Sequence, residues 1–374
     1  MRQDQTQPLR SLIKELEALC ERACLVRALR AVLGLFLSGK RVTLQNVEGI
    51  SASSASRFFQ RTRDAQSYWQ VFNAWQRALL WQLYERSNRQ GRRKGLVLKV
   101  DLTSIAKTGK GLPWVRVFHG VFGIHVVVLH AHVGSLCLPL ARRIYLGKGQ
   151  TKPISHALAM LAEWTALDAL TQVTVMADAD FFSRELLREC AKLGYQRVIL
   201  GVAKDRRLAD GKNVAQGRKG EQVRLQGWQD KPLWLSWARV KRDGRYKRFY
   251  ILATFRASGT YLARLYRQRW LIESFFQAAK HDFGLKEVRL RTQHALDLWL
   301  FFSLLAFTLA AFERAHHPLR SNGRYPLTLL QAAANVLETL FLPWLRQLAH
   351  LELQRLDRLA RLHRHSSYQQ ECKT

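Results

Sequence analysis

The pattern of apolar and polar residues divides the chain into three parts. Residues 8–37 place apolar side chains every three or four positions, which predicts a helix that ends near Ser38 and Gly39. Residues 67–87 predict a further helix, and the chain after Leu285 has a helical pattern to its end. Between these helical parts, short apolar runs alternate with helical segments. That alternation predicts an α/β domain in the middle of the chain.

The middle part contains five apolar runs bounded by turn residues. They predict strands over 96–101, 114–122, 124–133, 173–177 and 197–202, with helices over 154–170 and 181–193. Residues 204–250 are more polar, and glycines interrupt them, so this segment predicts a small group of short strands inserted into the α/β domain.

Two of the predicted strands end in an aspartate. Asp101 follows the first apolar run, and Asp178 follows the fourth and precedes a helix that Asp180 or Ser183 could cap. Aspartate at a strand end is often only a turn former or a helix cap, so each residue alone is weak evidence for a site. A pair of acids at the same edge of a sheet is, however, an arrangement that binds divalent metal ions.

A third acid lies on a predicted helix over 266–284. Tyr266, Arg269, Glu273 and Lys280 follow one another at spacings of three, four and seven residues, which places all four on one helix face. A solvated helix with an Arg269–Glu273 ion pair is the simpler interpretation of the same pattern. With Asp101 and Asp178, the helix completes a set of three carboxylates.

The spacing YxxRxxxExxxxxxK resembles the signature of DDE transposases of bacterial insertion sequences, in the branch called family four. Asp101 and Thr103 resemble the DxT motif of that family. The segment 177–181, ADADF, resembles its ADRGF motif, but Asp180 stands where glycine is usual. The resemblance covers about residues 95–285. It implies a ribonuclease-H-like core, a mixed five-stranded sheet with flanking helices in which the first and fourth strands are neighbours.

The resemblance also implies roles for particular side chains. Asp101, Asp178 and Glu273 are the expected catalytic residues and the ligands of two Mg²⁺ ions, for which Mn²⁺ would substitute. Two such ions activate the attacking oxygen and stabilise charge on the leaving oxygen in phosphodiester transfer. The expected DNA contacts comprise three residues of the signature, two that follow Asp101, three tryptophans of the insertion and one arginine near the N-terminus: Tyr266, Arg269, Lys280, Thr103, Lys107, Trp228, Trp234, Trp237 and Arg57.

Several of these contacts have simpler interpretations. Lys107 belongs to a glycine-containing loop that is equally well a plain turn, and the tryptophans are as well explained as core residues. Arg57 lies in a segment, 42–64, that reads as a helix-turn-helix, with a turn at 49–51. A helical hairpin that packs Phe58 and Phe59 into a core fits the same pattern.

Charge narrows the class of partner. The chain has 60 Lys and Arg against 28 Asp and Glu, a formal net charge of +32. Such an excess favours a polyanion, above all nucleic acid, although an anionic membrane would attract it too. The one long apolar segment, 298–312, is short for a membrane span and predicts a buried helix. An odd number of cysteines, five, and an N-terminus without a signal-peptide pattern predict a reducing cytoplasmic location, associated with the nucleoid.

These observations predict a DNA transposase that binds the ends of its element, cleaves DNA and joins strands. The expected partners are double-stranded DNA, both terminal inverted repeats and target, and a second copy of the chain in the synaptic complex, with no membrane. A nuclease that cuts without joining and a catalytically silent DNA-binding repressor remain alternatives. The expected regions are a helical DNA-binding region 1–90, a catalytic core 91–203 and 251–318, a β insertion 204–250 and a basic helical region 319–374.

Overall fold

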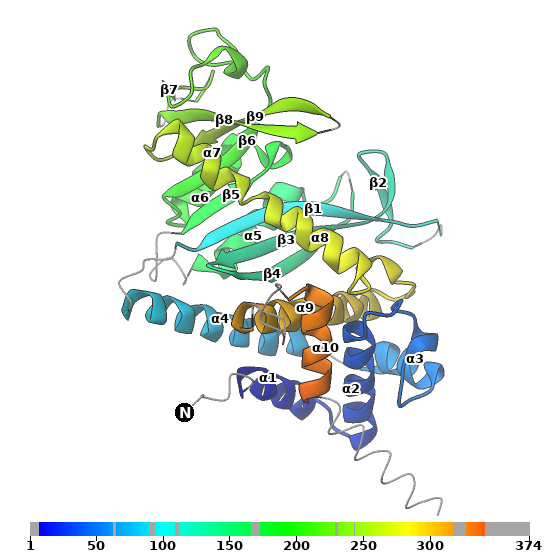
Figure 1. Cartoon of the computed structure of the whole chain (residues 1–374). Coiled ribbons are helices and arrows are strands. Elements are labelled where there is room, and N and C mark those ends of the chain that lie inside the picture. Colours follow the sequence, from blue (N-terminus) through cyan, green and yellow to red (C-terminus); the bar gives the residue numbers. More distant parts are fainter. Residues whose placement is uncertain are drawn as a thin grey trace, which may run out of the picture.

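The computed structural model describes residues 7–62, 65–89, 95–108, 112–147, 149–165, 173–228, 231–242, 244–317 and 327–340 (Figure 1). Parts of several predicted segments therefore lie outside the described residues. They include residues 166–170 of the predicted helix 154–170, residues 229–230 and 243 of the insertion, residues 109–111 after Lys107, and most of the C-terminal basic region, 319–326 and 341–374.

The described residues form one mixed nine-stranded sheet at the centre of the molecule. Its strands are β1 (Val97–Ala106), β2 (Arg116–Phe118), β3 (Val121–Val133), β4 (Leu136–Tyr145), β5 (Thr174–Ala177), β6 (Arg197–Val202), β7 (Gln222–Val223), β8 (Leu233–Arg242) and β9 (Arg245–Ala253). Their order is β2-β3-β1-β5-β6-β9-β8-β7, and β4 pairs with β3.

The central strands have the arrangement that the resemblance implies. β1 pairs in parallel with β5, and β5 with β6, whereas β3 runs antiparallel to both β1 and β4. The register places Val100 opposite Ala177, so the residues that follow them, Asp101 and Asp178, leave neighbouring strands at the same level. The predicted adjacency of the first and fourth strands is confirmed.

Three details of the predicted sheet are wrong. The third core strand is β4, which the apolar pattern does not predict because Pro139 and two arginines interrupt it. Proline is tolerated in β4 because this strand pairs only with β3, and the register shifts beside Pro139. β1 does not end at Asp101 but continues to Ala106 against β3. The predicted strand 114–122 is divided, because β2 ends at Phe118 and β3 begins at Val121. The insertion extends the same sheet, because β9 pairs with β6.

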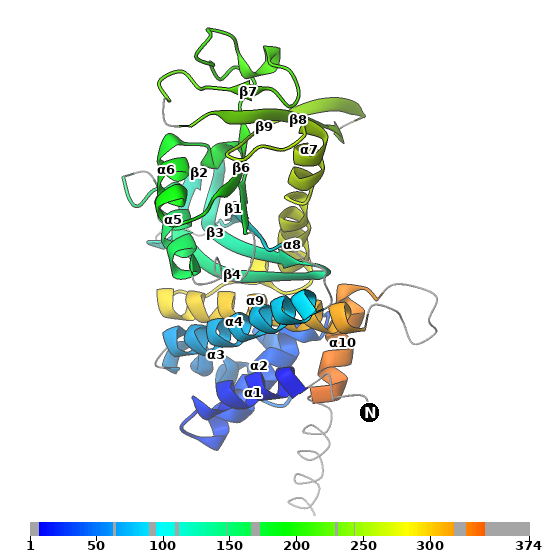
Figure 2. The same cartoon turned by 90° about the vertical axis from the view of Figure 1, so that its left-hand side faces the viewer.

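The helices lie on both faces of the sheet and beyond one edge of it. They are α1 (Gln7–Ala18), α2 (Ala23–Leu37), α3 (Ala52–Arg61), α4 (Ala65–Arg89), α5 (Pro153–Glu163), α6 (Arg184–Lys192), α7 (Gly259–Arg267), α8 (Trp270–His281), α9 (Gln293–His316) and α10 (Leu329–Leu340). Figure 2 shows α5 and α6 on one side of the sheet and α7 and α8 on the other. The predicted helices 8–37 and 266–284 are each divided in two.

The N-terminal helices and the last two described helices pack together below the sheet (Figure 1). Phe58 and Phe59 of α3 are buried against Trp299 and Phe302 of α9, with ring centroids 5.4 to 5.9 Å apart. α9 is long and apolar enough to cross a membrane, but 94% of its most apolar stretch is buried inside the protein. The prediction of a buried helix over 298–312 is therefore confirmed.

Candidate active site

Three acidic side chains converge on one face of the sheet, each from a different element. Asp101 lies on β1, Asp178 directly follows β5, and Glu273 lies in the first turn of α8. Asp101 is only 8% exposed, whereas the Glu273 side chain is 48% exposed. Asp178 accepts a hydrogen bond from the backbone N–H of Asp180 at 3.0 Å, which fixes its carboxylate at the start of a short 3₁₀ turn.

The environment of the two aspartates favours their neutral forms. Burial, and after it the negative charge of Asp178, raise the pKa of Asp101 to about 7. Burial and then the charge of Asp180 raise the pKa of Asp178. The positive charge of Arg269 is therefore too small to offset the burial of these two carboxylates.

The nearest positive charge is the guanidinium of Arg269, which joins two of the acids. Its Nη1 donates to Asp101 Oδ2 at 3.0 Å, and its Nη2 donates to Glu273 Oε1 at 2.5 Å. The Arg269 side chain is 8% exposed. Arg269 lies between α7 and α8, where the backbone N–H of Ile272 bonds to its carbonyl in a tighter, three-residue turn. The break in the predicted helix thus directs this side chain inward to β1.

Tyr266, at the end of α7, reaches beneath the acids to the backbone of β5. Its hydroxyl donates to the carbonyl of Ala177 at 3.5 Å, and the residue is buried. Burial raises the pKa of this phenol, so it remains protonated and able to donate. In this structure Tyr266 fixes α7 to the strand that precedes Asp178, and its predicted contact with DNA stays a prediction.

The other residues predicted around the acids differ in position. Thr103 is buried on β1, two residues beyond Asp101 and on the same face of the strand. Lys107 donates to the carbonyl oxygens of Lys286 and Val288 at 3.0 and 2.6 Å, and so ties the end of β1 to the segment after α8. Lys280 lies in the last turn of α8, where burial lowers its pKa.

Asp180 is separated from this cluster. Its side chain is 61% exposed, and one carboxylate oxygen lies 3.6 Å from Nδ1 of His119. Arg269 hydrogen-bonds to Asp101 and lowers the pKa of Asp178 against the effect of burial, whereas the Asp180 side chain faces His119. The geometry therefore favours Asp178 as the second acid of the ADADF segment.

Comparison with known proteins now assigns a family. The family described as "Transposase DDE domain" matches residues 99–309, more than half of the chain and all three acids. The chain belongs to this family.

A solved structure supports the same fold. The cryo-EM structure of a piggyBac transposase synaptic complex with hairpin DNA resembles 92% of this chain and 79% of that chain. The TM-score is 0.52 and the sequence identity 13%, so the likeness concerns the fold alone. No protein among curated sequences matches the chain.

Membership of the DDE transposase family implies dependence on a divalent metal ion, and the donor set fits one. Carboxylate oxygens are the ligands that hard divalent cations prefer, and a cation would relieve the repulsion between Asp101 and Asp178. Among the described residues, however, no three acidic, histidine or cysteine side chains form a preassembled metal cluster. Glu273 is directed at Arg269 instead. The pair of aspartates fits the metal, whereas Glu273 is bound to Arg269 in this structure.

The three tryptophans predicted as DNA contacts of this transposase are not equally accessible. Trp228 is buried, and its indole N–H donates to the carbonyl of Lys231 at 2.9 Å. Trp234 is half-buried against the core beneath α7. Trp237 is half-buried, with the cations of Lys219, Arg239 and Arg248 lying 4.8, 5.7 and 4.6 Å from the centre of a ring. Only Trp237 therefore combines partial exposure with neighbouring positive charge.

Two features of the surface were missed by the sequence analysis. Tyr246, at the tip of the β8–β9 hairpin, is 72% exposed and is the most exposed large apolar side chain among the described residues. Arg239 and Arg248 lie directly opposite each other across the same hairpin. The sequence does not predict this pair because the register of β8 against β9, which aligns Arg239 with a residue nine positions away, is not visible in the apolar pattern. Arg57, by contrast, is exposed on α3 as predicted, and donates to the hydroxyl of Ser54 at 3.1 Å.

Proposed function

We propose that this member of the family is a transposase of an insertion sequence, of the family-four type, that binds the ends of its element, cleaves the DNA and joins the strands. The observation that carries the proposal is the register between β1 and β5, which brings Asp101 and Asp178 together on the face from which Glu273 and Arg269 of the signature approach. A structural ion-pair network has no need of two buried acids on adjacent strands, one of which raises the pKa of the other.

In this proposal the chain supplies the ligands and the phosphate contacts of the reaction. Asp101 and Asp178 would hold the metal ions, and Glu273 would supply a further carboxylate from α8. Two Mg²⁺ ions, when bound, activate the attacking oxygen and stabilise charge on the leaving oxygen. Arg269 and Lys280 bind the phosphates that flank the scissile bond, because guanidinium and ammonium groups pair with phosphate oxygens.

The DNA-binding surface that we propose extends onto the hairpin of β8 and β9. The strand register puts Trp237, Arg239 and Lys241 on one face, opposite Tyr250, Arg248 and Tyr246 respectively. The other face packs on α7 and α8, where Ser236 donates to the carbonyl of Gly259 at 2.6 Å. Like charges directly opposite each other on a sheet are destabilising, which an anionic partner would relieve. The outer face, with its cations and aromatic rings, suits the phosphates and bases of DNA.

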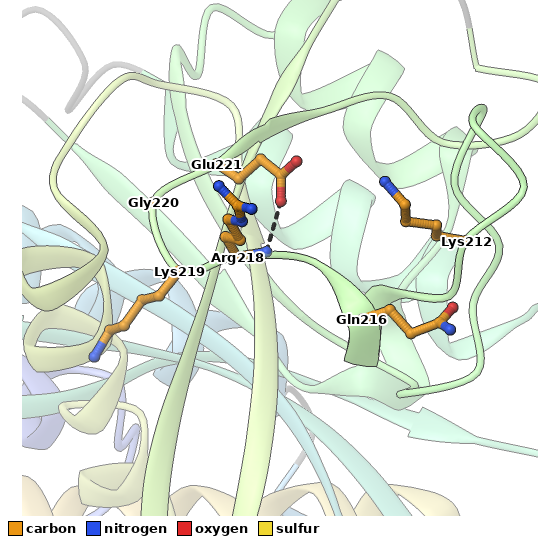
Figure 3. A pocket seen from close by; sticks show the side chains of 6 residues that line it. All are labelled: Lys212, Gln216, Arg218, Lys219, Gly220 and Glu221. Atoms are coloured by element: carbon orange, nitrogen blue, oxygen red, sulfur yellow. Dashed lines mark hydrogen bonds between the residues drawn. The ribbon is translucent and has the colours of Figure 1, made fainter.

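A basic hollow continues this face toward β7. It has a volume of about 470 Å³ and is lined by Lys212, Gln216, Arg218, Lys219, Gly220 and Glu221. Figure 3 shows Lys219 directed away from Lys212 and Gln216, and its ammonium lies over the ring of Trp237. The hollow and the hairpin therefore belong to one basic surface.

The regions keep their proposed roles: 1–90 recognises the element ends, 91–203 and 251–318 form the catalytic core, 204–250 is the insertion, and 319–374 is a basic helical region. Two chains would act together in the synaptic complex, in the cytoplasm.

The decisive experiment uses the DNA that flanks the coding region, labelled and presented as a duplex. A transposase gives metal-dependent cleavage at a matched terminal repeat, followed by products joined to a target plasmid. Cleavage without joined products would assign a nuclease, and binding without cleavage would assign a repressor. The Asp101→Asn variant controls for contaminating nuclease.

A further inference from the structure

The catalytic pocket contains its own cation. Arg269 contacts Asp101 and Glu273 with two different nitrogens, and its remaining Nε is buried with no hydrogen-bond partner among the described residues. Its charge also acts on Asp178, where it lowers the pKa against the effect of burial. One guanidinium thus interacts with all three acids of the site.

These contacts are not what a purely structural ion pair requires. Burying a guanidinium and a carboxylate costs desolvation energy, which is recovered only when all donors are satisfied. The Nε of Arg269 is unsatisfied, and the Glu273 side chain is half-exposed, so water can solvate it without a protein partner. The position of Arg269 is explained better by repulsion among the three acids. Three neighbouring carboxylates need a positive charge when no other cation is present.

We propose that Arg269 is a positioning residue that competes with the divalent metal for Asp101 and Glu273, and that it leaves them when a DNA phosphate takes its guanidinium. This rests on the proposed function, in which these acids are the metal ligands. The metal site is then complete only on DNA. Metal and DNA bind cooperatively, and the protein free of DNA is protected from premature cleavage.

The location of Arg269 makes the exchange possible without refolding. The residue lies between α7 and α8, and its long unbranched side chain can rotate about its own torsions. Glu273 lies one turn further along the same stretch, so its carboxylate stays beside Asp101 when the guanidinium moves. Phosphate offers the same bidentate geometry as a carboxylate to a guanidinium.

The first test measures Mn²⁺ binding to the DNA-free protein, from the electron paramagnetic resonance signal of the free ion. Arg269→Gln should bind Mn²⁺ about tenfold more tightly than the parent protein, a typical size for coupling between two sites. Arg269→Lys, which keeps the charge but cannot bridge two acids in the same way, should lie between them. Arg267→Gln, an exposed arginine of α7 changed in the same way, is the control and should leave the affinity unchanged.

The Asp101→Asn variant separates the two proposals. If it loses the Mn²⁺ site but Arg269→Gln binds Mn²⁺ no more tightly than the parent, the competition is wrong and the metal site stands. If Asp101→Asn leaves Mn²⁺ binding unchanged, the acids are not the metal site and the proposed function fails with it. Circular dichroism of each variant shows whether the fold is retained.

The second test repeats the Mn²⁺ measurement in the presence of a duplex that contains the element end. The amount of Mn²⁺ that the DNA binds without protein is subtracted. In the parent protein, DNA should increase Mn²⁺ affinity, because phosphate removes Arg269 from the acids. In Arg269→Gln, that increase should be about tenfold smaller, since the competitor is already absent. An equal DNA-dependent increase in both proteins would overturn the exchange.

Discussion

Gly201 on β6 lies directly beneath the hydroxyl of Tyr266, and no larger residue fits between them. A Cβ at Gly201 would stand 2.6 Å from the Tyr266 hydroxyl and 2.8 Å from the backbone nitrogen of Ala179. The glycine therefore allows α7 to approach the strands that carry the aspartates, and so sets the distance between the signature and the two acids.

Gly201→Ala should destabilise the protein by about 1–3 kcal/mol through overpacking and should reduce cleavage, because Tyr266 and Arg269 shift away from the acids. Urea unfolding and a cleavage assay measure the two effects. Gly34→Ala is the matched control. Its Cβ would meet only Leu337 at 3.7 Å, an ordinary contact in a helix, so stability should be unchanged or up to about 1 kcal/mol higher. Equal behaviour of both variants would argue against the close approach.

Asp101→Asn, Asp178→Asn and Glu273→Gln should each abolish metal-dependent cleavage while end binding in a gel shift is largely retained. Phosphate affinity is spread over many cations, whereas the metal ions depend on these acids. Asp180→Asn is the internal control and should cut normally, since its side chain is exposed and directed at His119. An inactive Asp180→Asn beside an active Asp178→Asn would reverse the assignment.

In the metal-free protein, the contribution of Asp101 to stability should fall as pH rises from about 4 to about 7. Burial and the charge of Asp178 raise the pKa of Asp101 to about 7 from a usual value of 3.8. Between these two values the folded state holds a proton on Asp101 that the unfolded state releases, so this carboxyl lowers the free energy of unfolding as pH rises. Burial lowers the pKa of His130 and His132, which acts in the opposite direction. The difference in melting temperature between the parent protein and Asp101→Asn, measured in EDTA at several pH values, isolates the effect of Asp101, and the advantage of the parent should shrink as pH rises.

Arg239→Gln should weaken DNA binding and also leave the fold equally or more stable. The substitution removes one of two like charges that face each other across β8 and β9, and it removes one cation from the proposed DNA surface. The slope of log affinity against log salt should fall by about 0.9 for one lost phosphate contact. Lys192→Gln on α6, where the lysine pairs with Glu189 at 2.7 Å, is the control. An unchanged slope for Arg239→Gln would remove the hairpin from the DNA surface.

Arg57→Ala should reduce the preference for the element end over unrelated DNA. If the guanidinium reads a base, the loss is about 1–3 kcal/mol of discrimination in a competition assay. Because Arg57 is exposed on α3, the free energy of unfolding of the protein should change by less than about 0.5 kcal/mol. A point substitution is needed here, since deleting the N-terminal helices would expose the rings of α9 that pack on Phe58 and Phe59. Unchanged selectivity would support the simple helical hairpin.

Several features followed from the sequence because they depend on local patterns. The strands that precede Asp101 and Asp178 are continuous apolar runs, and such runs are typical of strands covered on both faces. Glu273 was recognisable from its spacing to Tyr266, Arg269 and Lys280. That spacing is a property of the sequence, so it does not depend on whether α7 and α8 form one continuous helix. The excess of positive charge is a property of composition and needs no structure.

Other features were decided only by the tertiary structure. Arg269 is separated from Asp101 by 168 positions, and no periodicity along the chain relates the two. β4 is identified only by its pairing with β3, because Pro139 interrupts its apolar pattern. An edge strand tolerates proline at a position where its N–H would have no partner. The opposition of Arg239 and Arg248 depends on the register of a hairpin. Sequence patterns indicate which face of an element is buried. Contacts between elements arise from packing over long separations in the chain, and these contacts direct Arg269 at the acids.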